Sequence, residues 1–187
     1  MRKAIVAAVA ALLLSTGSEN TLASSVPSFL DGSVFYDNYL KTDIDPLLLY
    51  SISLAESAYK RDQSSVGPYR YAIQHNGKSY YPPTKQEASA ILDKLLKSGA
   101  KNIDVGFMQV NLLWNGDRVE SPHDLFDTIT SINVASEILL EAMHSSPDDI
   151  KVAIGRYHTW NDPVRGMVYA NRVLRIYTNI NKYYRKG

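Results

Sequence analysis

The chain has 187 residues, the size of one domain, and its 20 Lys and Arg nearly balance its 19 Asp and Glu. This balance argues against a mainly electrostatic partner, so we expect no nucleic acid as a partner. Cysteine is absent, which excludes disulfides, a thiolate metal site and a cysteine nucleophile.

The first 23 residues have the pattern of a secretory signal peptide. Arg2 and Lys3 precede an uncharged apolar run, 4–14, that is shorter than the roughly 20 residues needed to span a bilayer. Ala23 then ends a Thr-Leu-Ala tripeptide typical of a signal-peptidase site. We expect cleavage there, a neutral mature chain, a periplasmic location and no stable membrane insertion. The alternatives are cleavage near Gly17 and a retained N-terminal anchor.

A helix is predicted to follow an exposed lead-in, 24–44, which contains a short helical piece. Asp45-Pro46 is an N-cap residue followed by proline at the first helical position. Apolar residues then recur at helical spacing as far as Tyr59. The pattern fades at Arg61-Asp62, where we expect the helix to end.

Residues 69–98 are predicted to form a β-hairpin followed by a helix. Two short β-prone runs flank Asn76-Gly77, the strongest short hairpin signal. Thr84, with Glu87 three residues later, forms a capping box that begins a helix ending at Ser98-Gly99. An isolated two-stranded hairpin is marginal in water, so this segment must pack on the rest of the domain.

Three more helices are predicted in the second half of the chain. They extend over about 121–144, about 147–157 and about 166–177. The expected fold is therefore mainly α, with one domain over 45–178 that contains the small hairpin insertion. The remaining residues, 179–187, are expected to be a C-terminal tail.

Glu56 is the first candidate for chemistry. It is the only charged residue between Asp45 and Lys60, and it borders the apolar face of its helix. Partial burial and the dipole at a helix C-terminus both raise the pKa of a carboxyl group. A proton retained near neutral pH is what a general acid needs. The alternative is an edge glutamate that faces solvent.

Three motifs occur in a fixed order along the chain. They are Glu56-Ser57, then Gly106-Phe107-Met108-Gln109-Val110-Asn111, then Ala153-Ile154-Gly155-Arg156-Tyr157-His158. The ordered set resembles the catalytic domain of soluble lytic transglycosylases, whose fold is related to goose-type lysozyme. The resemblance implies a lysozyme-like fold and cleavage of peptidoglycan between N-acetylmuramic acid and N-acetylglucosamine.

The resemblance implies that Glu56 is the one catalytic acid/base. It would protonate the bridging oxygen and then take a proton from the C6 hydroxyl as that oxygen attacks C1, which yields a 1,6-anhydro sugar. Because this attack is intramolecular, the second carboxylate of ordinary glycosidases is not needed. Asp104 is the nearest candidate second carboxylate, and we expect it to serve a turn or a cap. The supporting and substrate-binding residues that the resemblance implies are Ser57, Gly106, Met108, Gln109, Asn111 and Tyr157.

Several of these residues have a structural alternative. Ser57 can bond the glutamate or the substrate, or cap the helix end. Gly106 is expected to let the backbone approach the sugar. Met108 either contacts substrate or packs in the core. Tyr157 either positions the carboxyl group of Glu56 or is a core residue, and His158, where the family has Asn, is a further candidate.

Tyrosines gather in the predicted hairpin, and their rings with hydroxyl groups suit sugars. Of Tyr69, Tyr71, Tyr80 and Tyr81, we single out Tyr71 and Tyr81 as candidates for sugar contact. We expect the segment 69–98 to form a wall of the glycan groove. Cross-strand packing, a stabilising flap and a partner surface are the alternatives.

The chain also departs from the family pattern, because about fifty residues separate Glu56 from Gly106, many more than usual. The pattern around Arg156-Tyr157-His158 resembles transglycosylases encoded with conjugation and pilus machinery, which implies a secretion or conjugation apparatus as a partner. No metal-ligand cluster or nucleotide loop is found in the sequence, and we expect no cofactor. The alternatives in function are a hydrolytic muramidase and a non-catalytic wall-binding or assembly subunit.

Overall fold

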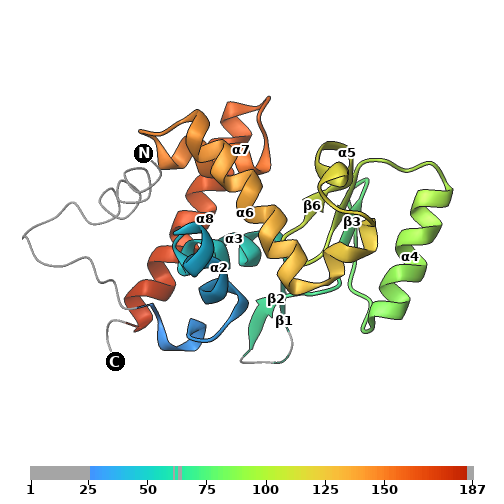
Figure 1. The fold of residues 1–187 in the computed structure, drawn as a ribbon, viewed down its shortest axis with the longest axis horizontal. Coiled ribbons are helices and arrows are strands. Elements are labelled where there is room, and N and C mark those ends of the chain that lie inside the picture. Colours follow the sequence, from blue (N-terminus) through green and yellow to red (C-terminus); the bar gives the residue numbers. More distant parts are fainter. Residues whose placement is uncertain (1–25, 61, 63–64, 185–187) are drawn as a thin grey trace, which may run out of the picture. The chain divides into compact units, whose positions relative to one another are not determined.

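The computed structural model describes residues 26–60, 62 and 65–184. The predicted signal peptide, 1–23, lies outside the described residues together with its cleavage site. The described chain is mainly helical with a small antiparallel sheet, which confirms the predicted fold class at that level (Figure 1). Among its helices, none is long and apolar enough to cross a membrane.

The α-helices are α2 (Val34–Thr42), α3 (Pro46–Ser57), α4 (Lys85–Lys97), α5 (Leu112–Asn115), α6 (Thr128–Ser145), α7 (Ile150–His158) and α8 (Pro163–Tyr184). The strands are β1 (Ala58–Lys60), β2 (Val66–Pro68), β3 (Ile73–His75), β4 (Lys78–Tyr80), β5 (Ile103–Val105) and β6 (Val110–Asn111). The short 3-10 helices are η1 (Ser28–Leu30), η2 (Gly116–Arg118) and η3 (Pro122–Phe126).

The described chain divides into two compact units. The first, which we call the helical unit, comprises residues 26–51 and 136–184. The second, which we call the mixed unit, comprises residues 52–135 and contains all six strands. Helices α3 and α6 each contribute residues to both units.

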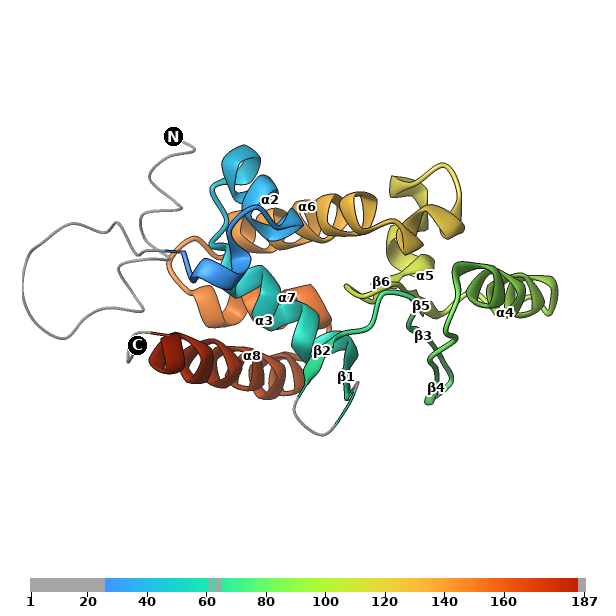
Figure 2. The same cartoon turned by 90° about the horizontal axis from the view of Figure 1, so that it is seen from below.

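In the helical unit, α7 and α8 pack closely because a glycine of each faces the other. A Cβ added at Gly155 would lie 2.9 Å from the backbone of Gly166, and one added at Gly166 would lie 3.2 Å from the backbone of Gly155. Neither position has room for a side chain in a close-packed interior. The long red helix in Figure 2 is α8, which buries Tyr169, Val173 and Tyr177 along one side.

Both ends of the helical unit differ from the prediction. The lead-in is not wholly exposed, because Leu30 and Phe35 are buried. The ring of Phe35 meets that of Tyr50 edge to face, with centroids 5.3 Å apart. At the other end, α8 extends beyond Tyr177 to Tyr184, through most of the predicted tail. The contact between Phe35 and Tyr50 joins residues that are distant in sequence, and a local sequence pattern does not predict such a contact.

The mixed unit contains the predicted hairpin, now part of a four-stranded antiparallel sheet of order β4-β3-β5-β6. The turn residues Asn76 and Gly77 both have positive φ, 49° and 75°, as a tight two-residue hairpin requires. On its other side β3 pairs with β5, where Ile73 is opposite Val105. The hairpin is therefore stabilised by the strand that leads directly into Gly106.

Helix α3 ends at Ser57, earlier than the apolar pattern predicts, and Tyr59 lies on a strand. β1 pairs with β2 so that Tyr59 is opposite Gly67. The backbone N–H of Tyr69 donates to the carbonyl of Ser57 at 3.0 Å. Strand pairing thus satisfies the backbone groups that another helical turn would have used.

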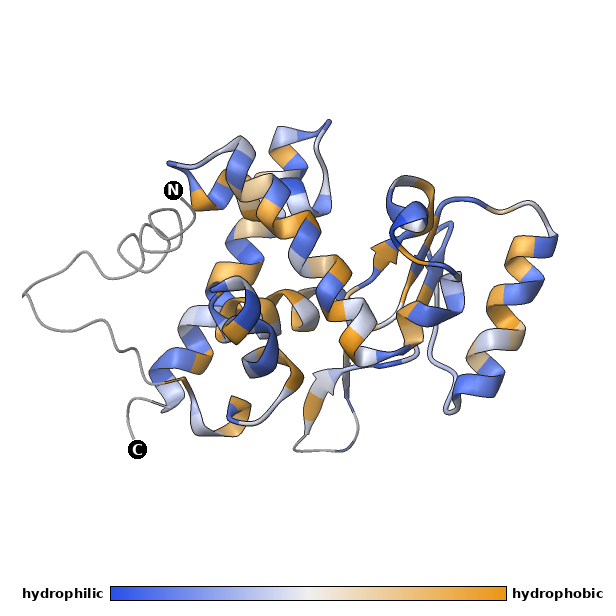
Figure 3. Ribbon diagram, viewed as in Figure 1, coloured by the Kyte–Doolittle hydropathy of each residue, from blue (hydrophilic) through white to orange (hydrophobic). Residues whose placement is uncertain are grey.

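The predicted N-cap of α4 is confirmed, because the Thr84 hydroxyl accepts a 3.2 Å hydrogen bond from the N–H of Glu87. Polar and apolar residues both occur along this helix (Figure 3), and Ala88 and Leu92 are its fully buried residues. Asp93 of α4 lies 3.0 Å from the ring of His123 in η3. The segment 69–98 is therefore folded into the mixed unit.

Candidate active site

Helix α3 places Glu56 at its last turn, next to its final residue. The helix begins as the sequence predicts, because the Asp45 carboxylate accepts a 2.7 Å hydrogen bond from the N–H of Leu47. The buried Leu48 and Ile52 fix the apolar side of α3. Glu56 is the one charged residue of this helix, and its side chain is half-buried. It therefore sits at the boundary between interior and solvent, where a carboxyl group can be both shielded and reached.

Ser57 connects the end of α3 to two other segments of the mixed unit. Its buried hydroxyl donates to the carbonyl of Phe107 at 2.7 Å, and also contacts the carbonyl of Ser53 at 3.2 Å. The same oxygen accepts a 3.2 Å hydrogen bond from the N–H of Tyr69. Ser57, which directly follows Glu56, thus fixes the end of α3 against the loop that carries Gln109. This loop contains the second of the predicted motifs.

Gln109 closes that loop with its side chain. Its backbone is left-handed, with φ 48°. Its amide nitrogen donates to the carbonyl of Gly106 at 2.8 Å and to that of Ala72 at 3.2 Å. The N–H of Gly106 donates to the same Ala72 carbonyl at 2.9 Å. The nitrogen of Gln109 therefore shapes the loop, and its amide oxygen is the part of the side chain that can bind a ligand.

The structure gives another reason for glycine at position 106 than the close approach of a sugar. Gly106 has φ 79°, and a Cβ there would collide with the carbonyl oxygen of Leu125. A side chain is excluded by the protein's own backbone. Met108 is 0% exposed, so its side chain is a core residue and lines no surface that a sugar can reach. The structure thus favours the core alternative for Met108, and the approach of a sugar to the backbone of Gly106 stays a prediction.

Asn111 organises the turn that follows the loop. Its amide donates to Asn102 at 2.6 Å and to Asp104 at 2.7 Å, and its oxygen accepts from the N–H of Leu113 at 3.1 Å. Asn111 is thus the N-cap of α5. Asp104 accepts from Asn111 within the sheet, in line with the structural duty expected of it. The short helix carries Trp114, which is 72% exposed and which the sequence did not single out.

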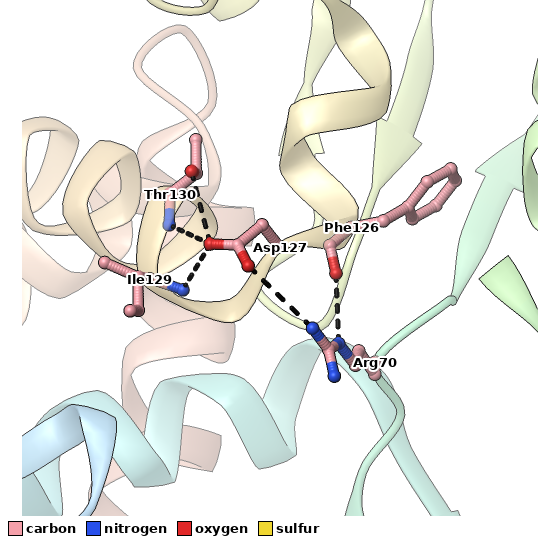
Figure 4. Close-up of polar contacts among 5 residues, drawn as sticks. All are labelled: Arg70, Phe126, Asp127, Ile129 and Thr130. Atoms are coloured by element: carbon pink, nitrogen blue, oxygen red, sulfur yellow. Dashed lines mark hydrogen bonds and ion pairs between the residues drawn. The ribbon is translucent and has the colours of Figure 1, made fainter.

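Arg70 ties the loop before β3 to the start of α6 (Figure 4). Its Nε donates to the carbonyl of Phe126 at 3.1 Å, and its guanidinium lies 3.9 Å from the carboxylate of Asp127. Asp127 in turn accepts 3.0 Å hydrogen bonds from the N–H groups of Ile129 and Thr130. The hydrogen bonds from Thr130 and Ile129, and then the charge of Arg70, lower the pKa of Asp127. Arg70 therefore anchors the loop before β3 to the start of α6.

Three tyrosines form a cluster beyond the end of α3, which we call the tyrosine cluster: Tyr59, Tyr69 and Tyr81. Their ring centroids lie 4.7 to 5.4 Å apart. The hydroxyl of Tyr69 donates to the carbonyls of Tyr81, at 3.2 Å, and Pro82, at 2.9 Å. Burial raises the pKa of Tyr69, and Tyr59 adds to this. Tyr59 and Tyr81 are 39% and 41% exposed, so the cluster presents aromatic faces to solvent.

The other predicted tyrosines lie outside this cluster. Tyr71 is half-buried and meets Phe126 edge to face, with centroids 6.0 Å apart. Tyr80 is covered by the ammonium group of Lys78, 4.8 Å from its ring centroid. Tyr59 was missed because the helical pattern extended over it. The sequence feature that could have identified Tyr59 is its position, because it is an aromatic residue three positions after the candidate acid.

Tyr157 and His158 belong to the helical unit, and their approach to Glu56 stays a prediction. Tyr157 is half-buried on α7. The ring of His158 stacks on that of Tyr169, with centroids 4.5 Å apart and an angle of 7° between the planes. Desolvation by the surrounding protein lowers the pKa of His158, and the charges of Arg165 and Arg172 lower it further. His158 is therefore a neutral ring at neutral pH.

Comparisons with known proteins add nothing to these features: no family model, no curated protein and no solved structure matches the chain.

Proposed function

We propose that this protein is a peptidoglycan lytic transglycosylase with a lysozyme-like catalytic fold, in which Glu56 is the acid/base. The observation that carries the proposal is the hydrogen bond from Ser57 to Phe107. It fixes the end of α3, which carries the half-buried Glu56, against the Gly106–Gln109 loop. A catalytic acid must be positioned by groups that do not themselves move.

The reaction proceeds through two proton transfers at Glu56. The protonated carboxyl group donates to the oxygen between N-acetylmuramic acid and N-acetylglucosamine as the bond from C1 to that oxygen breaks. The resulting carboxylate accepts the proton of the muramic acid C6 hydroxyl while the C6 oxygen bonds to C1. Glu56 is thereby reprotonated, and no water is consumed. The products are a 1,6-anhydro-muramic acid end and a free 4-hydroxyl group on N-acetylglucosamine.

A transglycosylase is favoured over a hydrolytic muramidase by the surroundings of Asp104. An inverting hydrolase needs a second carboxylate that activates water, and a retaining one needs a carboxylate nucleophile. Asp104 accepts a 2.7 Å hydrogen bond from Asn111 within the sheet, so it is used to hold the turn. The intramolecular attack of the C6 hydroxyl removes the need for such a group.

The glycan is proposed to bind along the exposed polar and aromatic groups of the mixed unit. The amide oxygen of Gln109 can accept a hydrogen bond from an acetamido N–H. The tyrosine cluster offers aromatic faces, and sugar rings stack on such faces. By resemblance, the enzyme acts in the periplasm and opens the wall locally for a conjugation, pilus or secretion apparatus.

The test is digestion of purified peptidoglycan sacculi by wild type and Glu56→Gln, with mass spectrometry of the released fragments. Wild type should release 1,6-anhydro-muramic acid ends, and Glu56→Gln should be slower by about 10² to 10⁴, the contribution of a general acid–base group. Glu87→Gln, an exposed glutamate on α4, is the matched control and should keep the wild-type rate. Reducing muramic acid ends would identify a hydrolase, and binding without any cleavage would identify a non-catalytic subunit.

A further inference from the structure

The charges of the chain are segregated along its sequence, although their total is nearly balanced. All 19 Asp and Glu lie before Pro163, and the chain from Pro163 onward has six Lys and Arg and no acid. Four of these six cations lie on α8: Arg165, Arg172, Arg175 and Lys182. All four are exposed, and within the described part of the chain none of them forms an ion pair. Four exposed cations on a helix without acidic residues can attract an anion from outside the chain.

Two of the arginines flank the aromatic stack of the helical unit. Arg165 precedes Tyr169 by four residues and Arg172 follows it by three, so the three residues share one side of α8. The ring of His158 lies flat on that of Tyr169. Both guanidinium charges act on His158. We call Arg165, Arg172 and His158 the arginine–histidine cluster, which combines two cations with a ring N–H donor.

A neighbouring arginine shows how a guanidinium group is used structurally in the same unit. Arg156 donates to the carbonyl and the hydroxyl of Ser145, at 2.9 and 2.7 Å. Its guanidinium also lies 5.2 Å from the ring centroid of Trp160. The side chains of Arg165 and Arg172 have no such partners in the described chain. Guanidinium groups form paired hydrogen bonds with carboxylates, so the exposed donors of Arg165 and Arg172 suit a ligand that carries carboxylates.

We propose that the arginine–histidine cluster binds the carboxylates of the peptide stems of peptidoglycan. Through this contact the protein binds the wall polymer independently of glycan cleavage. The choice of polymer rests on the proposed function. The peptide stems are its carboxylate-bearing part, whereas the N-acetylglucosamine units carry no charge. The cluster would thus recognise the peptide portion of the substrate, and Glu56 the glycan portion.

An anionic membrane fits this helix less well. Helices that lie in a membrane interface separate a basic face from an apolar face. The apolar side of α8, with Tyr169, Val173 and Tyr177, is already buried in the protein. On its exposed side, Val164, Met167 and Val168 form an apolar patch of little more than one turn, and Tyr183 and Tyr184 lie at the far end of the helix. The exposed apolar residues therefore do not extend along α8.

The test is co-sedimentation of the Glu56→Gln protein with insoluble sacculi, which measures binding without digestion. Adding Arg165→Gln and Arg172→Gln should weaken binding about ten- to a hundredfold, the range for losing charge-assisted hydrogen bonds, and should reduce its salt dependence. The matched control adds Lys41→Gln and Lys151→Gln, two exposed cations of the helical unit outside α8, and should bind like the parent. Sacculi whose stem carboxylates have been converted to amides by a carbodiimide and ammonia stay insoluble, and should bind the parent as weakly as untreated sacculi bind the double arginine variant. Thermal unfolding of all variants verifies that they fold.

Three results would overturn the inference. The first is equal binding by the arginine and lysine variants, and the second is undiminished binding of the parent to sacculi with amidated stem carboxylates. The third is arginine-dependent binding to vesicles of anionic phospholipid without binding to sacculi. Cleavage by the protein with Glu56 intact is scored separately. Anhydro ends without peptide-dependent binding refute only this inference, and peptide-dependent binding without cleavage refutes only the transglycosylase.

Discussion

The hydroxyl of Ser57 donates a 2.7 Å hydrogen bond to the carbonyl of Phe107, 50 residues later in the chain. This bond joins the residue after the candidate acid to the loop that carries the second predicted motif. It gives the Glu-Ser pair a physical meaning within the proposed function, in which the glutamate supplies the chemistry and the serine fixes the helix end that carries it.

Ser57→Ala should lower the free energy of unfolding by about 1 to 3 kcal/mol, because it leaves the Phe107 carbonyl without this buried donor. Ser51→Ala is the matched control. Ser51 is equally buried on α3, but it donates only to the carbonyl of Leu47 in its own helix. That loss should cost well under about 1 kcal/mol. Urea denaturation measures both, and equal losses would show that the bond to Phe107 contributes nothing specific.

Gly106→Ala should be far more costly than Gly99→Ala, although the two glycines have nearly the same φ, 79° and 82°. Left-handed backbone costs an alanine about 1 to 2 kcal/mol at either position. At Gly106 the added methyl also meets the Leu125 carbonyl, which raises the total to about 3 kcal/mol or more, whereas Gly99 faces open space. Chemical denaturation of the two variants tests this, and similar losses would contradict the packing argument.

Asp127→Asn should remove part of the acid sensitivity of the fold. The pKa of Asp127 is lowered in the folded state by the hydrogen bonds from Thr130 and Ile129 and by Arg70. Its stabilisation is therefore complete above the unfolded pKa of about 3.9 and is lost as pH falls through the lower folded pKa. Asparagine is also a good N-cap, so stability at pH 7 should change little. Denaturation from pH 7 to pH 2 should give a shallower decline for the variant than for wild type.

Tyr59→Ala and Tyr81→Ala should each slow the digestion of long glycans, because both remove an exposed face of the tyrosine cluster. Thermal stability should stay within the range of ordinary mutations, about 1 kcal/mol. Tyr183→Ala is the matched control, an exposed tyrosine of α8 in the other unit. If digestion of sacculi is unchanged in both cluster variants, the cluster is scaffold or a partner surface.

His158 should titrate below the ordinary histidine pKa of about 6.5. Desolvation is the first cause, followed by Arg165 and Arg172, so Arg172→Gln should move the pKa of His158 upward. Lys182→Gln removes a cation from the same helix that is not among those causes, and it should leave this pKa in place. Imidazole proton shifts in NMR titrations give the values. An equal response to both variants would mean that His158 senses only net charge.

The sequence predicts those features that depend on neighbours a few residues away. Asp45-Pro46 begins α3, Asn76-Gly77 forms the hairpin turn, and Thr84 caps α4, because each is a contact between a residue and its own local backbone. The order of the Glu-Ser and Gly-Phe-Met-Gln motifs likewise indicated which residues to examine. The assignment of Glu56 as the acid stays a proposal.

The tertiary structure decided what these residues touch. Gly106 must be glycine because of the carbonyl of Leu125, and Met108 is a core residue. Tyr59 joins a cluster with Tyr69 and Tyr81 because a strand replaces the last turn of the predicted helix. Each outcome is set by a partner far along the chain, and a pattern of spacing carries no information about such partners. Whether a charge finds an ion-pair partner is also decided only in space, which is why the unpaired arginines of α8 could not be recognised from a nearly neutral composition.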